Sequence, residues 1–192
     1  MGNHRHILKT LRAIAVEHAG AAHPDLASMA RELGRVVHRD ASALASRLAS
    51  LRKRQSGFER FTLTRRSKPP LSVVVMAWPP NYASPVEDHA GSWGLELALI
   101  GPLEVQSWQR EADSGELILQ GRNWLGPGDG AWFEGAPSQL RRCRNLSRHE
   151  TALSLHVYGT DLSDQLMRAT IRTAGPQIVT PARTVIADQL HG

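Results

Sequence analysis

Three residues able to do chemistry, Ser154, His156 and Tyr158, are spaced two apart near the end of an alternating stretch. On a β-strand this spacing places all three side chains on one face. If that face lines a barrel, the three can form a hydrogen-bonded chain that fixes the imidazole tautomer and aims the phenol into the cavity. The alternative is a buried polar trio that only satisfies its own hydrogen bonds.

The segments that must position these residues have period two from about residue 58 onward, which predicts strands. Turns rich in glycine, proline and aspartate separate them. About eight strands joined by tight turns predict a mainly β protein with a sandwich or barrel. Two further elements are possible: a helix within Asp161–Ile171 and an edge strand within Gln177–Ile186. The predicted strands are Phe58–Leu63, Leu71–Trp78, Gly91–Ile100, Leu103–Arg110, Glu116–Gln120, Gly130–Phe133, Gln139–Asn145 and Ala152–Tyr158.

The first part of the chain, from residue 4 to about 55, has apolar residues at three- and four-residue spacing, which predicts three short helices. Pro24 suits the first turn of the second helix, and Asp40 could cap the third. Such short helices need tertiary packing to persist. We therefore predict a helical region, residues 1–55, packed on a β-domain of residues 56–192. A helix-turn-helix interpretation is weaker, because no recognition helix stands out.

Composition narrows the classes of function. The 192 residues carry a formal charge of +5, but the basic runs are short and not interleaved with aromatic residues, which disfavours nucleic acid as a partner. No stretch approaches 18 consecutive apolar residues, so we expect no membrane span. A single cysteine, Cys143, excludes an intrachain disulfide, and a reducing cytoplasm is the expected location.

Three sequence motifs resemble a known family. The run from Trp78 to Gly94, Trp-Pro-Pro-Asn-Tyr-Ala-Ser-Pro-Val-Glu-Asp-His-Ala-Gly-Ser-Trp-Gly, is similar to the first cupin motif of small-thiol dioxygenases. Gly126-x-Gly-Asp-x-x-x-Phe133 is similar to the turn before the second motif. Asn145 followed by Ser154-x-His-x-Tyr158 resembles the signature of cysteine dioxygenases. The resemblance implies a jelly-roll-type cupin β-barrel after the N-terminal helices.

The resemblance also implies a ferrous iron held by three histidines, and here the chain departs from the family. His89 is retained, but Glu87 and Arg141 stand at the other two ligand positions. Arginine cannot bind a metal, since its guanidinium stays protonated. We expect either no metal or non-standard Fe(II) ligation by Glu87 and His89. Glu96 could add a third ligand, although a solvent-facing Glu96 is favoured. Gly94 offers no cysteine for a thioether cross-link to the tyrosine.

Two further expectations concern charge in the pocket. If the barrel brings Glu87 and Arg141 together, their opposite charges could pair and fill the vacated site. The alternative is that Arg141 points outward, because strand register decides which arginines of this segment face the cavity. By the resemblance, Arg60 is the candidate that binds the substrate carboxylate. An inward-facing Arg141 would also bind or polarise the substrate anion, and Tyr82, in place of a small or polar residue, is expected to narrow the mouth of the pocket.

These observations lead to one functional hypothesis and two alternatives. The first is a repurposed enzyme that binds a small acid or thiol, with Glu87, His89, Ser154, His156 and Tyr158 at the catalytic centre. The second is an iron-dependent dioxygenase that converts a thiol to a sulfinate with O2, using Glu87 and His89 as ligands. The third is a non-catalytic small-acid sensor or binding module.

Overall fold

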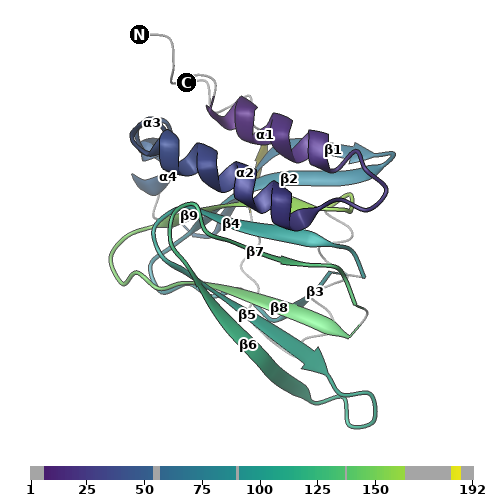
Figure 1. The fold of residues 1–192 in the computed structure, drawn as a ribbon. Coiled ribbons are helices and arrows are strands. Elements are labelled where there is room, and N and C mark those ends of the chain that lie inside the picture. Colours follow the sequence, from purple (N-terminus) through teal and green to yellow (C-terminus); the bar gives the residue numbers. More distant parts are fainter. Residues whose placement is uncertain (1–6, 54–56, 90, 137, 163–182, 187–192) are drawn as a thin grey trace.

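The computed structural model describes residues 7–53, 57–89, 91–136, 138–162 and 183–186. Helices come first, and strands follow in two sheets (Figure 1). The helices are α1 (Ile7–His18), α2 (Leu26–Arg39), α3 (Ala41–Arg47) and α4 (Ala49–Lys53). The strands are β1 (Glu59–Ser67), β2 (Pro70–Trp78), β3 (Glu87–Asp88), β4 (Gly94–Ile100), β5 (Leu103–Arg110), β6 (Leu117–Leu125), β7 (Gly130–Phe133), β8 (Gln139–Asn145), β9 (Ala152–Tyr158) and β10 (Arg183–Ile186).

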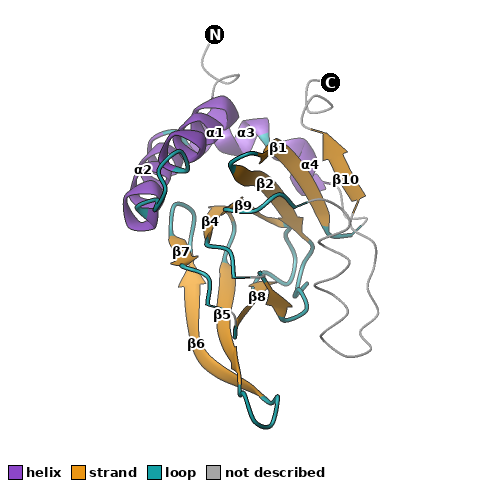
Figure 2. Cartoon of the chain, turned by 90° about the vertical axis from the view of Figure 1, so that its right-hand side faces the viewer, coloured by secondary structure: helices purple, strands orange, loops and turns teal. Residues whose placement is uncertain are grey.

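The strands form a six-stranded sheet in the order β10-β1-β2-β9-β4-β7 and a four-stranded sheet in the order β3-β8-β5-β6. The two sheets face each other across the interior of the barrel, and the helices lie on the far side of the six-stranded sheet (Figure 2). This arrangement confirms the predicted mainly β architecture with N-terminal helices. The strand β3 was not predicted, and β6 runs five residues further than the alternating pattern indicated.

The central strands of the six-stranded sheet, β2, β9 and β4, are buried on both faces. On β2, Val73 and Val75 belong to one apolar cluster with the helices, whereas Val74 and Met76 belong to a second cluster inside the barrel. Alternate strand residues point to opposite faces, so a strand covered on both sides is a continuous apolar run. The helices thus seal one side of the sheet whose other side lines the pocket.

The helix caps differ in part from the sequence-based expectations. Helix α2 begins after Asp25, whose carboxylate accepts a hydrogen bond from the Ser28 amide at 2.9 Å, so Pro24 lies before the helix rather than in its first turn. Asp40 does precede α3, but its carboxylate bonds to Arg39 instead of capping the helix. Among the helices that the structure describes, none has the length and apolar character needed to cross a bilayer.

Candidate active site

A small, partly open pocket lies between the two sheets. The strands that contribute to it belong to both sheets, so its floor and walls are fixed by the barrel itself. Most of its lining side chains are polar or aromatic, and four carry charge. The lining residues are Phe58, Arg60, Met76, Trp78, Ser84, Glu87, His89, Glu96, Arg141, Cys143, His156 and Tyr158.

The centre of the pocket holds a buried ion pair between Arg141 of β8 and Glu96 of β4. Arg141 donates from Nη2 and Nε to Glu96 Oε2 at 2.8 and 3.1 Å, and from Nη1 to Ser107 Oγ at 3.1 Å. Both residues are 3% exposed. The guanidinium carbon also lies 4.7 Å from the ring centroid of Phe133. Arg141 therefore faces the cavity and reaches across it to the opposite sheet.

This pair corrects two expectations. Glu96 is buried rather than solvent-facing, because it pairs in register with His156 on the inner face of β9. Arg141 bonds to Glu96 instead of Glu87, although Glu87 is its neighbour across the β3–β8 ladder. A fully buried carboxylate needs a hydrogen-bonding partner more than a partly buried one does. Burial alone would raise the pKa of Glu96, but the charge and hydrogen bonds of Arg141, together with the nearby His156 and His89, outweigh burial and lower that pKa.

Glu87 and Arg60 are two further charged groups that line the pocket. They influence each other electrostatically without forming a contact ion pair. Burial raises the pKa of the Glu87 carboxyl, and the charge of Arg60 opposes this only in part. Arg60 lies over the Phe58 ring at 5.1 Å, and its buried Nε has no hydrogen-bond partner among the described residues. Both charges therefore remain available to a ligand.

The predicted serine–histidine–tyrosine chain is formed on the inner face of β9. Ser154 Oγ lies 2.7 Å from His156 Nε2, and His156 Nδ1 lies 2.8 Å from the Tyr158 hydroxyl. All three side chains are buried. Burial lowers the pKa of His156 to about 4, so the imidazole is neutral at pH 7. Burial likewise raises the pKa of Tyr158 well above its ordinary value, which keeps the phenol protonated.

Trp78 determines which group donates and which accepts in each hydrogen bond between Ser154, His156 and Tyr158. Its Nε1 donates to Ser154 Oγ at 2.7 Å, so the serine oxygen already accepts one hydrogen bond. If the serine proton points to His156 Nε2, the imidazole proton sits on Nδ1 and points to Tyr158. The opposite tautomer leaves the buried serine hydroxyl without an acceptor among the described residues, which is costly. The favoured arrangement frees the Tyr158 proton to donate into the pocket.

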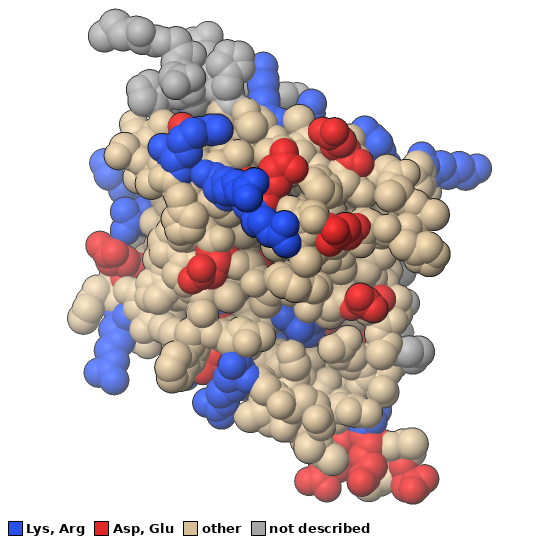
Figure 3. Space-filling view, viewed as in Figure 1, with Lys and Arg blue, Asp and Glu red and all other residues tan. Residues whose placement is uncertain are grey.

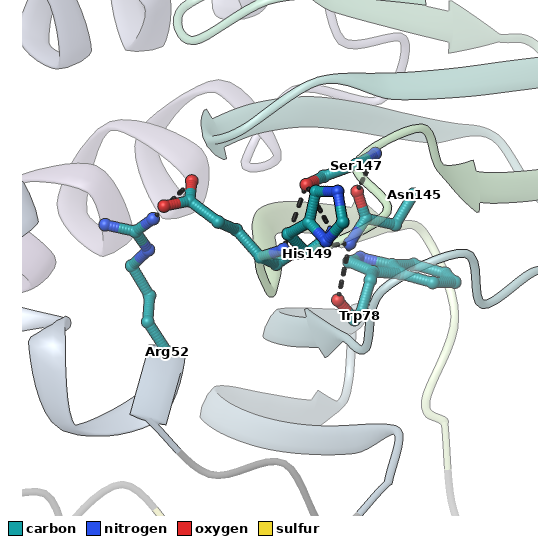
Figure 4. A network of polar contacts seen from close by, with 6 residues as sticks. Arg52, Trp78, Asn145, Ser147 and His149 are labelled. Carbon is teal, nitrogen blue, oxygen red and sulfur yellow. Dashed lines mark hydrogen bonds and ion pairs between the residues drawn. The ribbon is translucent and has the colours of Figure 1, made fainter.

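Trp78 is held in turn by Asn145, as Figure 4 shows. Asn145 Nδ2 donates to the carbonyls of Trp78, Pro79 and Glu150 at 2.9, 3.1 and 2.8 Å. Its Oδ1 accepts from the Ser147 amide at 2.9 Å. The Glu150 carboxylate pairs with Arg52 of α4 at 2.9 Å. One fully buried amide thus fixes the residue that anchors the hydroxyl–imidazole chain.

His89 lies beside this chain on an aromatic surface. Its ring is edge-on to Phe133, with centroids 4.8 Å apart, and lies 5.2 Å from the Tyr158 ring. Burial lowers the pKa of His89, which disfavours the imidazolium despite the nearby Glu96. Its buried Nδ1 has no hydrogen-bond partner among the described residues.

A family model for cysteine dioxygenase type I matches residues 58–167, more than half of the chain. The chain belongs to the cysteine dioxygenase type I family. The cupin fold expected from the sequence motifs is thereby confirmed.

Several solved structures are similar to this chain over part of its length. The protein TT1209 from Thermus thermophilus is 20% identical, with 57% of this chain and 91% of that chain covered and a TM-score of 0.44. The cupin domain of Schizosaccharomyces pombe Cnp3 is 13% identical, with 62% and 69% covered and a TM-score of 0.42. An oxalate oxidase in complex with glycolate is 15% identical, with 56% and 53% covered and a TM-score of 0.42.

The side chains present do not fit the three-histidine iron site that the sequence resemblance to cysteine dioxygenases implies. Arg141 occupies one ligand position, and a guanidinium offers no lone pair to a metal. Its charge and its bonds to Glu96 also engage the carboxylate that could have replaced a ligand. In the part of the chain that the structure describes, no three His, Cys, Asp or Glu residues are grouped to hold a metal ion.

The other candidate residues lie at the pocket or its rim. Tyr82 stacks on Phe58, with centroids 5.1 Å apart and planes 9° from parallel, beside the guanidinium of Arg60. Burial raises the pKa of the Cys143 thiol well above its ordinary value, so the pocket-lining cysteine is a poor nucleophile. Gly94 lies against Tyr158, and a Cβ atom there would come within 2.8 Å of the tyrosine ring.

Sequence reasoning missed three contributors, namely Trp78, Ser107 and Phe133. Trp78 was recognised only as part of a motif, and its indole donor to Ser154 carried no sequence signal. Ser107 and Phe133 contact Arg141 from different strands. The alternation of β5 could have placed Ser107 on the inner face once Val105 was assigned to the core.

Proposed function

We propose that this family member binds a small carboxylate- or thiol-bearing metabolite and moves protons on it, with a degenerate iron site. The observation that carries the proposal is the Arg141–Glu96 ion pair within the pocket. It puts a permanent cation where the family would place a metal ligand. A divalent ion near that guanidinium would meet like-charge repulsion in a medium that screens poorly.

Arg60 is the proposed anchor for the anionic group of the ligand. Its guanidinium lines the pocket and keeps an unpartnered buried donor. Arginine binds carboxylates through two parallel hydrogen bonds, which also orient the bound molecule. The aromatic rings of Phe58 and Tyr82 beside it would cover the apolar part of the ligand.

Glu87 is the proposed proton acceptor, and Tyr158 the proposed donor. A carboxylate whose pKa is raised by burial is a better base once it is ionised, and the phenol proton is free to bond to a ligand oxygen. Arg141 would stabilise negative charge that develops on the ligand, because its guanidinium is fixed in place before binding. His156 orients the phenol rather than exchanging its own proton at neutral pH.

Two measurements test this proposal. Calorimetric titration with 3-mercaptopropionate, cysteine and propionate should detect a ligand whose affinity falls at least tenfold in Arg60→Ala. Incubation of that ligand in D2O should show, by NMR, deuterium uptake at the carbon next to the carboxylate. Uptake should be lost in Glu87→Gln and kept in Glu17→Gln, a matched change on the exposed face of α1. Absence of both binding and exchange would refute the proposal.

A second candidate is favoured by one observation, the unpartnered Nδ1 of His89 close to Glu87. An imidazole and a carboxylate are suitable ligands for ferrous iron. An iron-dependent thiol dioxygenase with this ligation would consume O2 in the presence of a thiol. Stoichiometric iron together with that uptake would favour this candidate over the first.

A further inference from the structure

The outer face of the four-stranded sheet differs in kind from its inner face. On β8, Arg141 and Cys143 line the pocket, so the alternate residues Leu140, Arg142 and Arg144 point outward. In the part of the chain that the structure describes, the helices cover the other sheet and leave this outer face open (Figure 2). No described helix covers this face, so the residues on it that stay exposed are informative.

The strand register brings arginine and tryptophan side chains together on this face, although they are scattered in the sequence. Outward-facing residues that pair in register on β8, β5 and β6 form three rows across the sheet. The rows are Arg144–Glu104–Trp124, Arg142–Gln106–Arg122 and Leu140–Trp108–Leu119. Trp124 is 76% exposed, the highest value among the exposed large apolar side chains of the described residues. An exposed tryptophan flanked by arginines is the composition of an interaction surface.

Hydrogen bonds link both tryptophans of this face to two polar side chains between them. Trp108 Nε1 donates to Gln106 Oε1 at 3.2 Å, and Gln106 Nε2 donates to Glu104 Oε1 at 2.5 Å. Glu104 Oε2 accepts from Trp124 Nε1 at 3.3 Å. Glu104 and Gln106 are 5% and 7% exposed, although they point out of the barrel. Both indole rings are therefore preorganised, which lowers the entropy cost of binding.

Charge is unevenly distributed along the β5–β6 hairpin and the neighbouring strand β8. The arginines Arg122, Arg142 and Arg144 lie near the first residues of β5 and the last residues of β6. The turn between β5 and β6 carries Glu111, Asp113 and Glu116. Figure 3 shows acidic side chains gathered at the tip of the molecule. Six strand residues separate the two ends, or about 20 Å at the usual rise per residue.

This pattern is complementary to itself. We propose that the outer face of β8, β5 and β6 is the interface of a homodimer in which two copies pack face to face, with their β5–β6 hairpins antiparallel. A two-fold axis near Trp108 would place the acidic turn of each copy over the arginines of the other. Trp124, Trp108 and Leu119 would be covered between them, whereas Leu140 is already buried within each copy. A nucleic acid fits less well, because the acidic turn would repel phosphates at one end.

The direct test is sedimentation of the full-length protein over a range of concentrations. A concentration-dependent dimer is expected, and Trp124→Ala should weaken it at least tenfold. Two charge reversals, Arg122→Glu/Arg144→Glu and Asp113→Lys/Glu116→Lys, should each give monomers, since each sets like charges against each other. Mixing the two reversed proteins should restore a heterodimer, because both contacts then unite opposite charges.

The mixing experiment also controls for misfolding, since a protein that has lost its fold cannot be rescued by a partner. A wild-type monomer at all concentrations would overturn the proposal, as would a dimer that neither reversal weakens. A monomer that binds a single-stranded oligonucleotide, and loses that binding in Arg144→Glu, would assign the face to nucleic acid instead. The test is independent of the proposed chemistry in the pocket.

Discussion

Neighbouring arginines on β8 have opposite environments, and the contrast explains much of the molecule. Arg141 points inward, is 3% exposed and is bound to Glu96 and Ser107. Arg142 and Arg144 point outward, and the Arg144 side chain is exposed to solvent. A buried guanidinium requires a carboxylate and fixed hydrogen bonds, whereas water satisfies an exposed one. The same residue type therefore forms a fixed, buried ion pair on the inner face and a hydrated charge on the outer face.

The largest expected loss of stability follows from removing the buried Arg141. Arg141→Ala leaves the Glu96 carboxylate buried without its ion partner, which should cost about 3–5 kcal/mol of unfolding free energy. Arg144→Ala should change the unfolding free energy of the monomer by less than about 0.5 kcal/mol. Urea unfolding at pH 7 measures both. Equal costs for the two substitutions would contradict the contrast. The double variant Arg141→Met/Glu96→Leu should recover much of the unfolding free energy lost in Arg141→Met alone, because no unpaired carboxylate then remains buried.

Acidification should destabilise the inner face through His156. Its pKa is lowered from 6.5 to about 4 in the folded protein, mainly by burial. A depressed pKa contributes stability that is complete above pH 6.5 and is lost as the pH falls toward 4. At about 1.4 kcal/mol per pH unit, the total is about 3 kcal/mol. Unfolding free energies at pH 7 and 4.5 should therefore differ less in His156→Gln than in the wild type. An unchanged pH dependence in that variant would contradict this assignment.

Asn145, on the same inward register as Arg141, gives a test of hydrogen bonding without charge. Asn145→Ala removes donors to three carbonyls and should cost about 1–3 kcal/mol. The change should also alter the near-ultraviolet circular dichroism of Trp78, because that backbone loses its anchor. Asn123→Ala, at an exposed position of β6, is the matched control. If Asn123→Ala lowered the unfolding free energy as much as Asn145→Ala, the hydrogen bonds of Asn145 would not account for the loss.

The smallest effect concerns reactivity and leaves stability unchanged. Cys143 also faces inward and is 4% exposed, and burial raises the pKa of its thiol. Alkylation by iodoacetamide at pH 8 should be at least about tenfold slower in the folded protein than in urea, since the thiolate is the reactive form. Fast alkylation under native conditions would show that the inner face opens to solvent.

The mainly β class could be predicted from the sequence because period-two alternation and turn residues indicate strands, and the cupin barrel was implied by the resemblance of three motifs to a known family. The serine–histidine–tyrosine chain could be predicted for the same reason, since its members lie on one strand. The partner of Arg141 could not, because Glu87 and Glu96 were both possible and only tertiary packing determines which carboxylate is buried. The arginine–tryptophan rows depend on register between strands, and a shift of one residue would have reversed every face.

If the Arg141–Glu96 pair has replaced the iron site of the family, the wild-type protein will not retain iron. Purified protein should be incubated with excess Fe(II) under anaerobic conditions, freed of unbound metal and assayed for iron per chain. The account predicts far less than one iron per chain, with increased retention in Glu87→His/Arg141→His, which restores three histidines. One tightly held iron per wild-type chain, together with O2 uptake on addition of cysteine or 3-mercaptopropionate, would contradict it.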